Sequence, residues 1–255
     1  FQWGMKNSHN ATYVTGPGQQ SQIDQGTLGY SQTTINFDVT TQMDMEGFAG
    51  PVSLAMGAEM RMENYTIEAG EEAGYADGGF DVLDGPNAGA SAAVGCQCLP
   101  GLAPNNEQDR DRDAFSVYVD AEADVLDNLL VNVALRTENY SDFGQTTNGK
   151  VAMRYELQDG VAARGSFSTG FRAPALQEAY FSSIATHFID GIPYEVGTFP
   201  VDTEPARALG AQDLEPETST NLSAGMTYKD DTFTVSVDAY QIKVDDRITM
   251  SETFN

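Results

Sequence analysis

The sequence predicts an all-β protein: an antiparallel up-and-down meander of about nine strands that forms part of a transmembrane β-barrel. Two observations carry this prediction. Nine segments alternate between apolar and polar residues with a period of two, as a strand with two different faces requires. The connections between these segments also alternate between short and long, which is typical of barrels with tight turns at one end and extended loops at the other.

The first five predicted strands begin with a short one at 1–8, and the next four show the alternation clearly. Every second residue in them is aliphatic or aromatic, while the intervening positions are mostly polar. The apolar positions are Ile35, Phe37, Val39 and Met43 in 34–43; Val52, Leu54, Met56, Ala58, Met60 and Met62 in 52–63; Phe115, Val117, Val119, Ala121 and Ala123 in 115–123; and Leu129, Val131, Val133 and Leu135 in 129–138.

The last four predicted strands repeat this pattern. One of them, at 161–171, has a face of small and apolar residues opposite a face that includes Arg164. The apolar positions are Val151, Met153, Tyr155 and Leu157 in 151–157; Val161, Ala163, Gly165 and Phe167 in 161–171; Leu222, Ala224, Met226 and Tyr228 in 221–228; and Phe233, Val235, Val237 and Ala239 in 233–239.

The connections fall into two length classes that alternate along the chain. Short turns are predicted at Glu46–Pro51, Asp124–Asn128, Gln158–Gly160 and Lys229–Asp231. Long extracellular loops are predicted near 9–29, 69–113 and 172–219, with a shorter one at 142–149. Structureless loops of this length are uncommon in compact soluble domains, so their regular placement favours a membrane barrel.

The polar face carries charges on most strands, which is atypical of the apolar interior of a small soluble barrel. If the apolar face meets lipid, the charged side chains line the lumen, and Arg136 and Glu138 are expected to pair with Glu156 and Arg154 on the next strand. The predicted lumen-lining residues are Glu59, Arg61, Glu63, Asp120, Glu122, Arg136, Glu138, Arg154, Glu156 and Arg164. The alternative is a soluble β-rich binding module with one face in water.

Composition excludes several classes of function. The 255 residues include 38 acids and 13 bases, giving a formal charge of -25, which argues against binding the phosphates of nucleic acid. No segment approaches the roughly 18 consecutive apolar residues of a membrane helix. No nucleophile and base pattern or phosphate-binding glycine loop is present, so the sequence predicts neither an enzyme nor a cofactor.

Several ordered motifs resemble one family. Gly170-Phe171-Arg172-Ala173-Pro174, followed by Leu176, Glu178 and Tyr180, is similar to the strand-to-loop junction of TonB-dependent outer-membrane receptors. The same family uses strings similar to Leu135–Gly144, Lys150–Tyr155 and Leu214–Ser219. Asp238–Ile242 and Asp246–Ile248 resemble its D-x-Y-x-I and D-R-I segments.

This resemblance implies a barrel of about 22 strands in the outer membrane of a Gram-negative bacterium, with a plug domain in its lumen. It implies TonB-coupled import of a scarce ligand, most often a ferric siderophore, with TonB contacted through a plug that this sequence lacks. The 255 residues are accordingly expected to be an internal barrel fragment. The alternatives are a passive outer-membrane channel or adhesin, which would have no energy coupling, and a haem receptor.

Two residues are candidates for the ligand-binding loop. Arg172 either contacts the ligand or, together with Pro174, anchors the base of the loop. Haem receptors of this family place an iron-ligating histidine in the same loop, where His187 lies, but the N-P-N-L motif that follows reads Ala211-Gln212-Asp213-Leu214 here.

Two further clusters remain open. Cys96 and Cys98 form a small loop disulfide or are ordinary thiols. The alternating Asp109, Asp111 and Asp113 either bind a cation or, with the arginines between them, form a self-neutralising strand entry.

Overall fold

The computed structural model describes residues 2–7, 22–95, 101–190 and 192–251. Nine strands form one antiparallel sheet, and each pairs with its neighbour in chain order except that β7 pairs with β10. These strands are β1 (Gln2–Asn7), β2 (Ile23–Met43), β3 (Val52–Glu68), β4 (Gln108–Leu126), β5 (Leu129–Tyr140), β6 (Gly144–Gln158), β7 (Val161–Arg172), β10 (Glu217–Lys229) and β11 (Thr234–Asp245).

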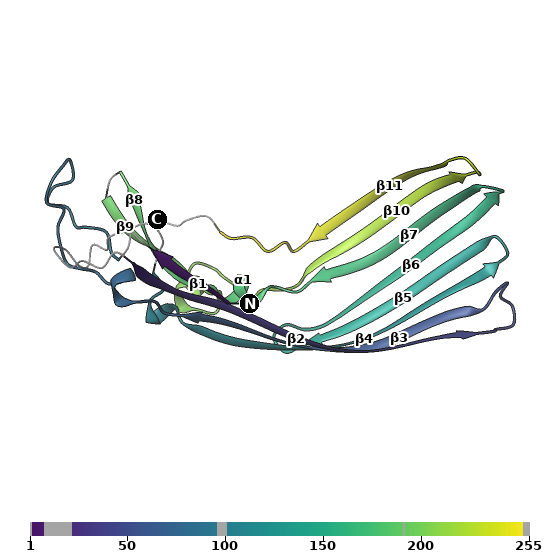
Figure 1. Cartoon of the computed structure of the whole chain (residues 1–255), viewed down its shortest axis with the longest axis horizontal. Helices are drawn as coiled ribbons and strands as arrows, with labels where there is room; N and C mark the ends of the chain where they lie inside the picture. Colours follow the sequence, from purple (N-terminus) through teal and green to yellow (C-terminus); the bar gives the residue numbers. More distant parts are fainter. Residues whose placement is uncertain (1, 8–21, 96–100, 191, 252–255) are drawn as a thin grey trace.

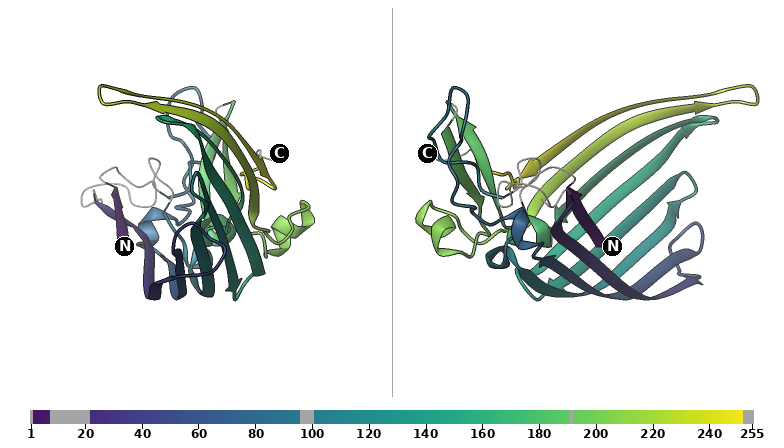
Figure 2. Two further views of the ribbon diagram at one scale, coloured as in Figure 1. Left: turned by 90° about the vertical axis from the view of Figure 1, so that its right-hand side faces the viewer. Right: turned by 60° about the vertical axis from the view of Figure 1, so that its left-hand side comes forward.

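The predicted meander is confirmed, and the sheet is open, with β1 and β11 as its edges. Figure 1 shows the strands side by side in chain order, and Figure 2 shows that the sheet curves like part of a barrel wall. The remaining two strands, β8 (Ser183–Ile189) and β9 (Ile192–Thr198), form a separate hairpin between β7 and β10.

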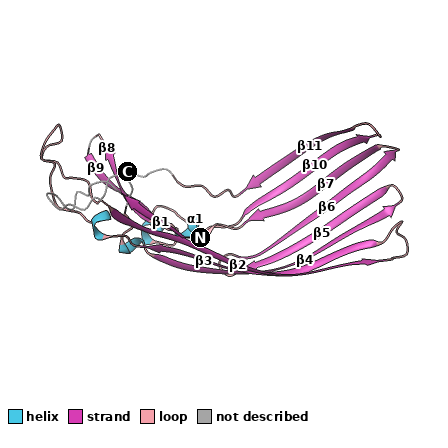
Figure 3. Cartoon of the chain, viewed as in Figure 1, coloured by secondary structure: helices cyan, strands magenta, loops and turns pink. Residues whose placement is uncertain are grey.

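The two ends of the sheet differ, as predicted from the connection lengths. At one end the strands are joined by short turns, such as the two-residue turn between β6 and β7. The other end carries the long connections and all the described helices (Figure 3). These helices are η1 (Glu72–Gly74), η2 (Pro104–Asn106), α1 (Leu176–Tyr180) and α2 (Glu204–Ala208). None of them has the length and apolar character needed to cross a membrane.

The strands are longer than predicted, which corrects the loop boundaries near 9–29, 69–113, 142–149 and 172–219. β2 begins at Ile23, β4 at Gln108 and β6 at Gly144, while β10 begins at Glu217. The strand pairing continues at these ends although the outer face has become polar and the apolar residues, such as Tyr65 and Ile67, lie on the inner face. The alternation used to assign the strands therefore ends before the strands do. The intermediate connection at 142–149 shrinks to the turn 141–143.

The register separates two faces along the whole sheet. Paired residues share a face, so Glu59, Ser116 and Glu138 lie on one side, and Met60, Phe115 and Asn139 lie on the other. We call the first the inner face and the second the outer face. The outer face exposes a broad apolar surface, including Ile35, Phe37, Met60, Phe115, Val133, Met153, Phe167, Leu222 and Val237.

Glycines let inner-face side chains reach over a neighbouring strand. Arg164 on β7 crosses β10 at Gly225 and meets Asp238 on β11 at 2.5 Å. Tyr118 on β4 crosses β3 at Gly57 and donates a 2.7 Å hydrogen bond to Asp38 on β2. A Cβ at either glycine would collide with the aspartate that is reached.

A small buried core joins the loops to the sheet at the loop-bearing end. Tyr65 and Ile67 of β3 pack with Leu102 and with Leu176 of α1, all at most 4% exposed. Burying each such side chain stabilises by about 1.5–3 kcal/mol, so this cluster holds two long connections against the wall.

Candidate functional site

A large hollow lies where the inner face meets the long connections. It has a volume of about 2140 Å³ and is open to solvent. Its floor comes from β2, β3, β4 and β5, and its walls come from residues 173–214 and 248–251. Because strands fix the floor while loops build the walls, the arrangement suits a binding site carried on a rigid scaffold.

The floor is a network of ion pairs. The Arg112 Nε and Nη2 each lie 2.8 Å from Oε2 of Glu63, and both side chains are almost fully buried. The other carboxylate oxygen of Glu63 accepts a 2.5 Å hydrogen bond from the Tyr30 hydroxyl. A buried charge is tolerated only when it is paired and hydrogen-bonded, and here both requirements are met.

Arg112 also ties the floor to the long loop. Its Nη1 donates a 2.5 Å hydrogen bond to the carbonyl oxygen of Pro174 and lies 3.5 Å from Asp142. Its guanidinium lies 5.5 Å from the ring centre of Tyr140, within the range of a cation–π contact. Arg112 therefore links three elements at the edge of the hollow.

A second arginine cluster lies on the inner face, nearer to the end of the sheet that carries the short turns. Arg136 bonds Glu138 on its own strand at 2.7 Å and reaches across β4 to Glu59 at 3.3 Å, passing Ser116. Arg61 bonds the same Glu59 at 2.7 Å.

The expected pairing of Arg136 and Glu138 with Glu156 and Arg154 is wrong. The register places Arg136 opposite Asn148, because the β5–β6 turn is only three residues long, while Arg154 bonds Glu156 of its own strand.

The ten residues predicted to line the lumen all occupy the inner face. The strand register shows this, because paired residues share a face: Glu59 pairs with Ser116, Glu122 with Asn132, and Arg154 with Arg164. Three of the ten line the hollow itself, namely Arg61, Glu63 and Glu138. Their role in a lumen stays a prediction.

Arg172 lies at the base of the loop, as a lining residue of the hollow. Its guanidinium makes a bidentate pair with Glu217, at 2.9 and 2.7 Å, and a further bond of 2.9 Å to Glu178 of α1. Glu217 in turn accepts a 2.8 Å bond from the backbone N–H of Ile248. Arg172 and Glu217 together thus connect the start of the loop, its end and the segment after β11.

His187 lies on β8, exposed and opposite Tyr194 on β9. It is not among the residues that line the hollow. Across the described ranges, no group of three or more His, Cys, Asp or Glu side chains is arranged to hold a metal ion. Cys96 and Cys98 lie outside the described residues.

Asp109, Asp111 and Asp113 alternate on the outer face of β4. The Asn64 amide donates hydrogen bonds to Asp109 and Asp111 at 2.8 and 2.9 Å. The arginines between them point to the opposite face, where Arg110 contacts the Tyr180 ring and Arg112 enters the floor network. The aspartates and the arginines therefore lie on opposite faces and make their contacts with different partners.

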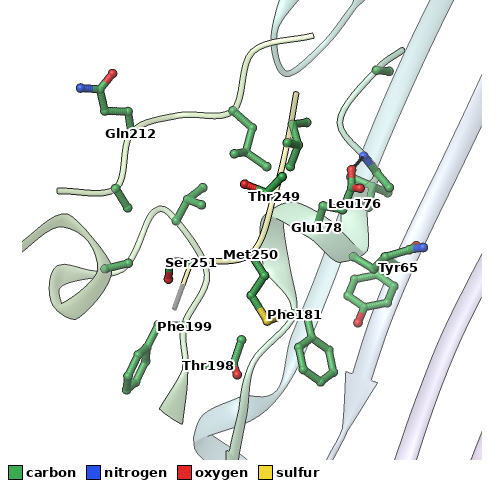
Figure 4. A pocket seen from close by; sticks show the side chains of 18 of the residues that line it. Tyr65, Leu176, Glu178, Phe181, Thr198, Phe199, Gln212, Thr249, Met250 and Ser251 are labelled. Atoms are coloured by element: carbon green, nitrogen blue, oxygen red, sulfur yellow. Dashed lines mark hydrogen bonds between the residues drawn. The ribbon is translucent and has the colours of Figure 1, made fainter. Parts of the chain in front are cut away.

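The walls contain apolar and aromatic residues that the sequence interpretation did not single out. Phe181, Tyr194, Phe199 and Met250 all line the hollow. Figure 4 shows Phe181, Thr198 and Met250 around the same space, with Met250 81% exposed. The high density of aromatic residues between Tyr180 and Phe199 could have indicated a binding role for this loop. Ligand sites are typically lined by apolar and aromatic side chains.

Comparisons with known proteins agree with this architecture. The family model for the TonB-dependent receptor-like β-barrel matches residues 1–255. No curated protein sequence matches the chain.

Three solved structures share the fold at low identity. The siderophore receptor PirA from Pseudomonas aeruginosa has a TM-score of 0.58 and 13% identity, over 88% of this chain and 34% of that one. PirA from Acinetobacter baumannii gives 0.58 and 14%, over 92% and 29%. A mutant of the P. aeruginosa ferric enterobactin receptor PfeA, in complex with enterobactin, gives 0.60 and 12%, over 95% and 31%. The chain spans about a third of the length of these structures.

Proposed function

The chain belongs to the TonB-dependent receptor β-barrel family, and from this we propose that it is part of the wall of an outer-membrane receptor that imports a ferric siderophore with energy relayed by TonB. Members of this family are transporters of the Gram-negative outer membrane rather than enzymes. The open nine-stranded sheet supports a place in a larger barrel, because each of its edge strands leaves one side free for another strand.

The hollow at the loop-bearing end is the observation that supports a binding role. It combines a rigid, ion-paired floor with apolar walls supplied by a long connection. Its volume exceeds the range of about 300–1,000 Å³ typical of small-molecule pockets, which suits a bulky ligand such as an iron chelate. The siderophore receptors that share the fold support the choice of ligand class.

Arg172 is proposed to position the loop rather than to touch the ligand. All its pairing capacity is directed to Glu217 and Glu178, which fix the two ends of residues 173–216. Bidentate pairs of this kind fix orientation as well as contributing energy. The contacts of Arg172 therefore hold the ends of the loop in place and help the hollow to keep its shape.

Uptake of radioactive iron tests this proposal. Cells that carry the full-length receptor are expected to accumulate iron from a panel of ferric siderophores, and cells lacking either the receptor or TonB are not. Equal uptake with and without TonB would instead indicate a passive channel, and no accumulation of any ferric chelate would contradict the proposed cargo.

A further inference from the structure

Among the described residues, every arginine that lines the hollow is already paired with a carboxylate. The lining contains three arginines and four glutamates, with no lysine, among the residues that the structure describes. These seven residues are Arg61, Glu63, Arg112, Glu138, Arg172, Glu178 and Glu195.

Each of the three arginines is already bound to a carboxylate. Arg61 meets Glu59 at 2.7 Å, Arg112 meets Glu63 at 2.8 Å, and Arg172 meets Glu217 at 2.7 Å. An anionic ligand would have to compete with these carboxylates for the guanidinium groups, and displacing one of them would leave a carboxylate without its cation. For the buried Arg112 and Glu63 pair, that exchange is especially unfavourable.

Glu195 adds a negative charge to the wall without a matching arginine. It lies on β9, exposed, and forms no ion pair with any residue in the described part of the chain. Its cross-strand partner Thr186 carries no charge. The largely apolar wall therefore carries one unpaired negative charge, and the ion-paired floor supplies no excess positive charge to offset it.

The two long connections add further negative charge at the same end of the sheet. Residues 69–107 contain six acids and no lysine or arginine. Residues 173–216 contain seven acids and a single arginine, Arg207, which is paired with Asp213. Because charges separated by about 8 Å or less are only partly screened at physiological salt, these loops repel an approaching anion.

We infer that the hollow selects a ferric chelate without net negative charge, of the hydroxamate type, over a trianionic catecholate chelate. This inference rests on the proposed function and narrows its ligand class. Three hydroxamates balance the charge of ferric iron, whereas three catecholates exceed it and leave a trianion. The neutral chelate places its apolar periphery against Phe181, Phe199 and Met250 without breaking an ion pair.

Equilibrium binding to the purified full-length receptor tests the inference, with two probes of similar bulk and different charge. The probes are ferrichrome, a neutral tris-hydroxamate complex, and ferric enterobactin, a trianionic tris-catecholate complex. We expect a dissociation constant for ferrichrome that is at least about tenfold lower than that for ferric enterobactin. The preference should shrink at high salt, because screening weakens the repulsion of the anion.

Glu195 supplies a directed variant and Asp231 its matched control. Glu195→Lys is expected to tighten binding of ferric enterobactin severalfold relative to ferrichrome, and Glu195→Gln to act in the same direction by a smaller factor. Asp231→Lys makes the same charge change in the turn at the far end of the sheet and should leave both constants unchanged.

The outcomes separate the inference from the proposed function. Tighter binding of ferric enterobactin than of ferrichrome by the unmodified receptor overturns the charge preference and leaves siderophore import standing. Binding of neither probe, nor of any other ferric chelate, contradicts the proposed function and the inference with it. An unchanged preference in both Glu195 variants would also contradict the unpaired charge of the wall as its cause.

Discussion

At the scale of single residues, the buried pair of Arg112 and Glu63 holds the floor of the hollow together. Arg112 joins β4 to β3 and to the first residues of the long loop, through Glu63 and Pro174. Each partner neutralises the other where water is largely absent. The pair therefore stabilises the site only while both members are present.

Removing one member should be costly. We expect Glu63→Ala to lower the free energy of unfolding of the full-length receptor by about 3 kcal/mol, because it leaves the buried Arg112 charge with only the more distant Asp142 carboxylate as an ionic partner. Urea unfolding in detergent measures the change. Arg154→Ala breaks an exposed pair with Glu156 and serves as the control, with an effect of about 1 kcal/mol or less. Equal losses in both variants would contradict the role given to burial.

Arg172 makes a second prediction at this scale. Arg172→Ala is expected to make residues 173–216 cleave faster in limited proteolysis, because Glu217 and Glu178 lose their common partner. Arg172→Lys should protect the loop only in part, since an ammonium cannot reproduce the bidentate geometry. Wild-type cleavage rates in both variants would show that the loop base is held by other contacts.

At the scale of strands and turns, glycines on the inner face permit contacts between strands that are not neighbours. Gly225→Ala should weaken the Arg164 and Asp238 pair, because the added methyl would collide with the Asp238 carboxylate. We expect a lower urea midpoint for the full-length receptor. Gly149→Ala is the matched control, since its Cβ would meet only ordinary contacts at 3.5 Å and beyond. A control loss as large as that of Gly225→Ala would contradict the account.

The β10–β11 turn should depend on pH. The Asp230 carboxylate accepts hydrogen bonds from the backbone N–H groups of Thr232 and Phe233, at 2.7 and 2.9 Å, and these lower its pKa in the folded protein. Its stabilisation is therefore present above the ordinary carboxylate pKa of about 3.9 and is lost as pH falls through the lower folded-state pKa.

The measurement compares unfolding of the wild-type receptor with Asp230→Ala at several pH values. The difference in stability should be full near neutral pH and should shrink in strongly acidic solution. A difference that does not change with pH would show that the Asp230 charge plays no part in the turn.

Sequence predicted the strand faces well because a single physical rule sets them. Where one side meets an apolar environment, every second residue must be apolar, as at Ile35, Phe37 and Val39. The rule fails where the outer face is polar and no longer alternates with apolar residues, so the starts of β2 and β4 were assigned to loops. The Arg136 and Glu59 contact was missed because it joins strands that are not neighbours. The expected pairing across β5 and β6 was wrong because it depended on a turn length that the pattern did not define.

The candidate site was less predictable than the fold. The junction at Arg172 was found because its motif is distinctive, yet its partners Glu217 and Glu178 were not. The hollow needs residues from five strands and two distant segments, and Met250 joins them only after the chain folds. No local sequence pattern predicts that these distant residues line the same hollow.

At the scale of the whole molecule, the sheet is a wall with two different sides. Its outer face exposes a broad apolar surface, and its inner face carries the ion pairs and the hollow. Soluble monomers rarely expose apolar patches of more than a few hundred Å². Together with membership of the receptor family, this predicts that lipid covers the outer face and that the inner face lines the lumen.

Spin labels at two adjacent residues test this central claim most directly. Asn36 and Phe37 are neighbours on β2 and point to the inner and outer face, respectively. In the full-length receptor reconstituted into lipid, a label on Phe37→Cys should be relaxed by oxygen and shielded from a water-soluble nickel chelate, and a label on Asn36→Cys should show the reverse. Equal access of the nickel chelate to both labels would contradict the account, because it would mean that water covers both faces.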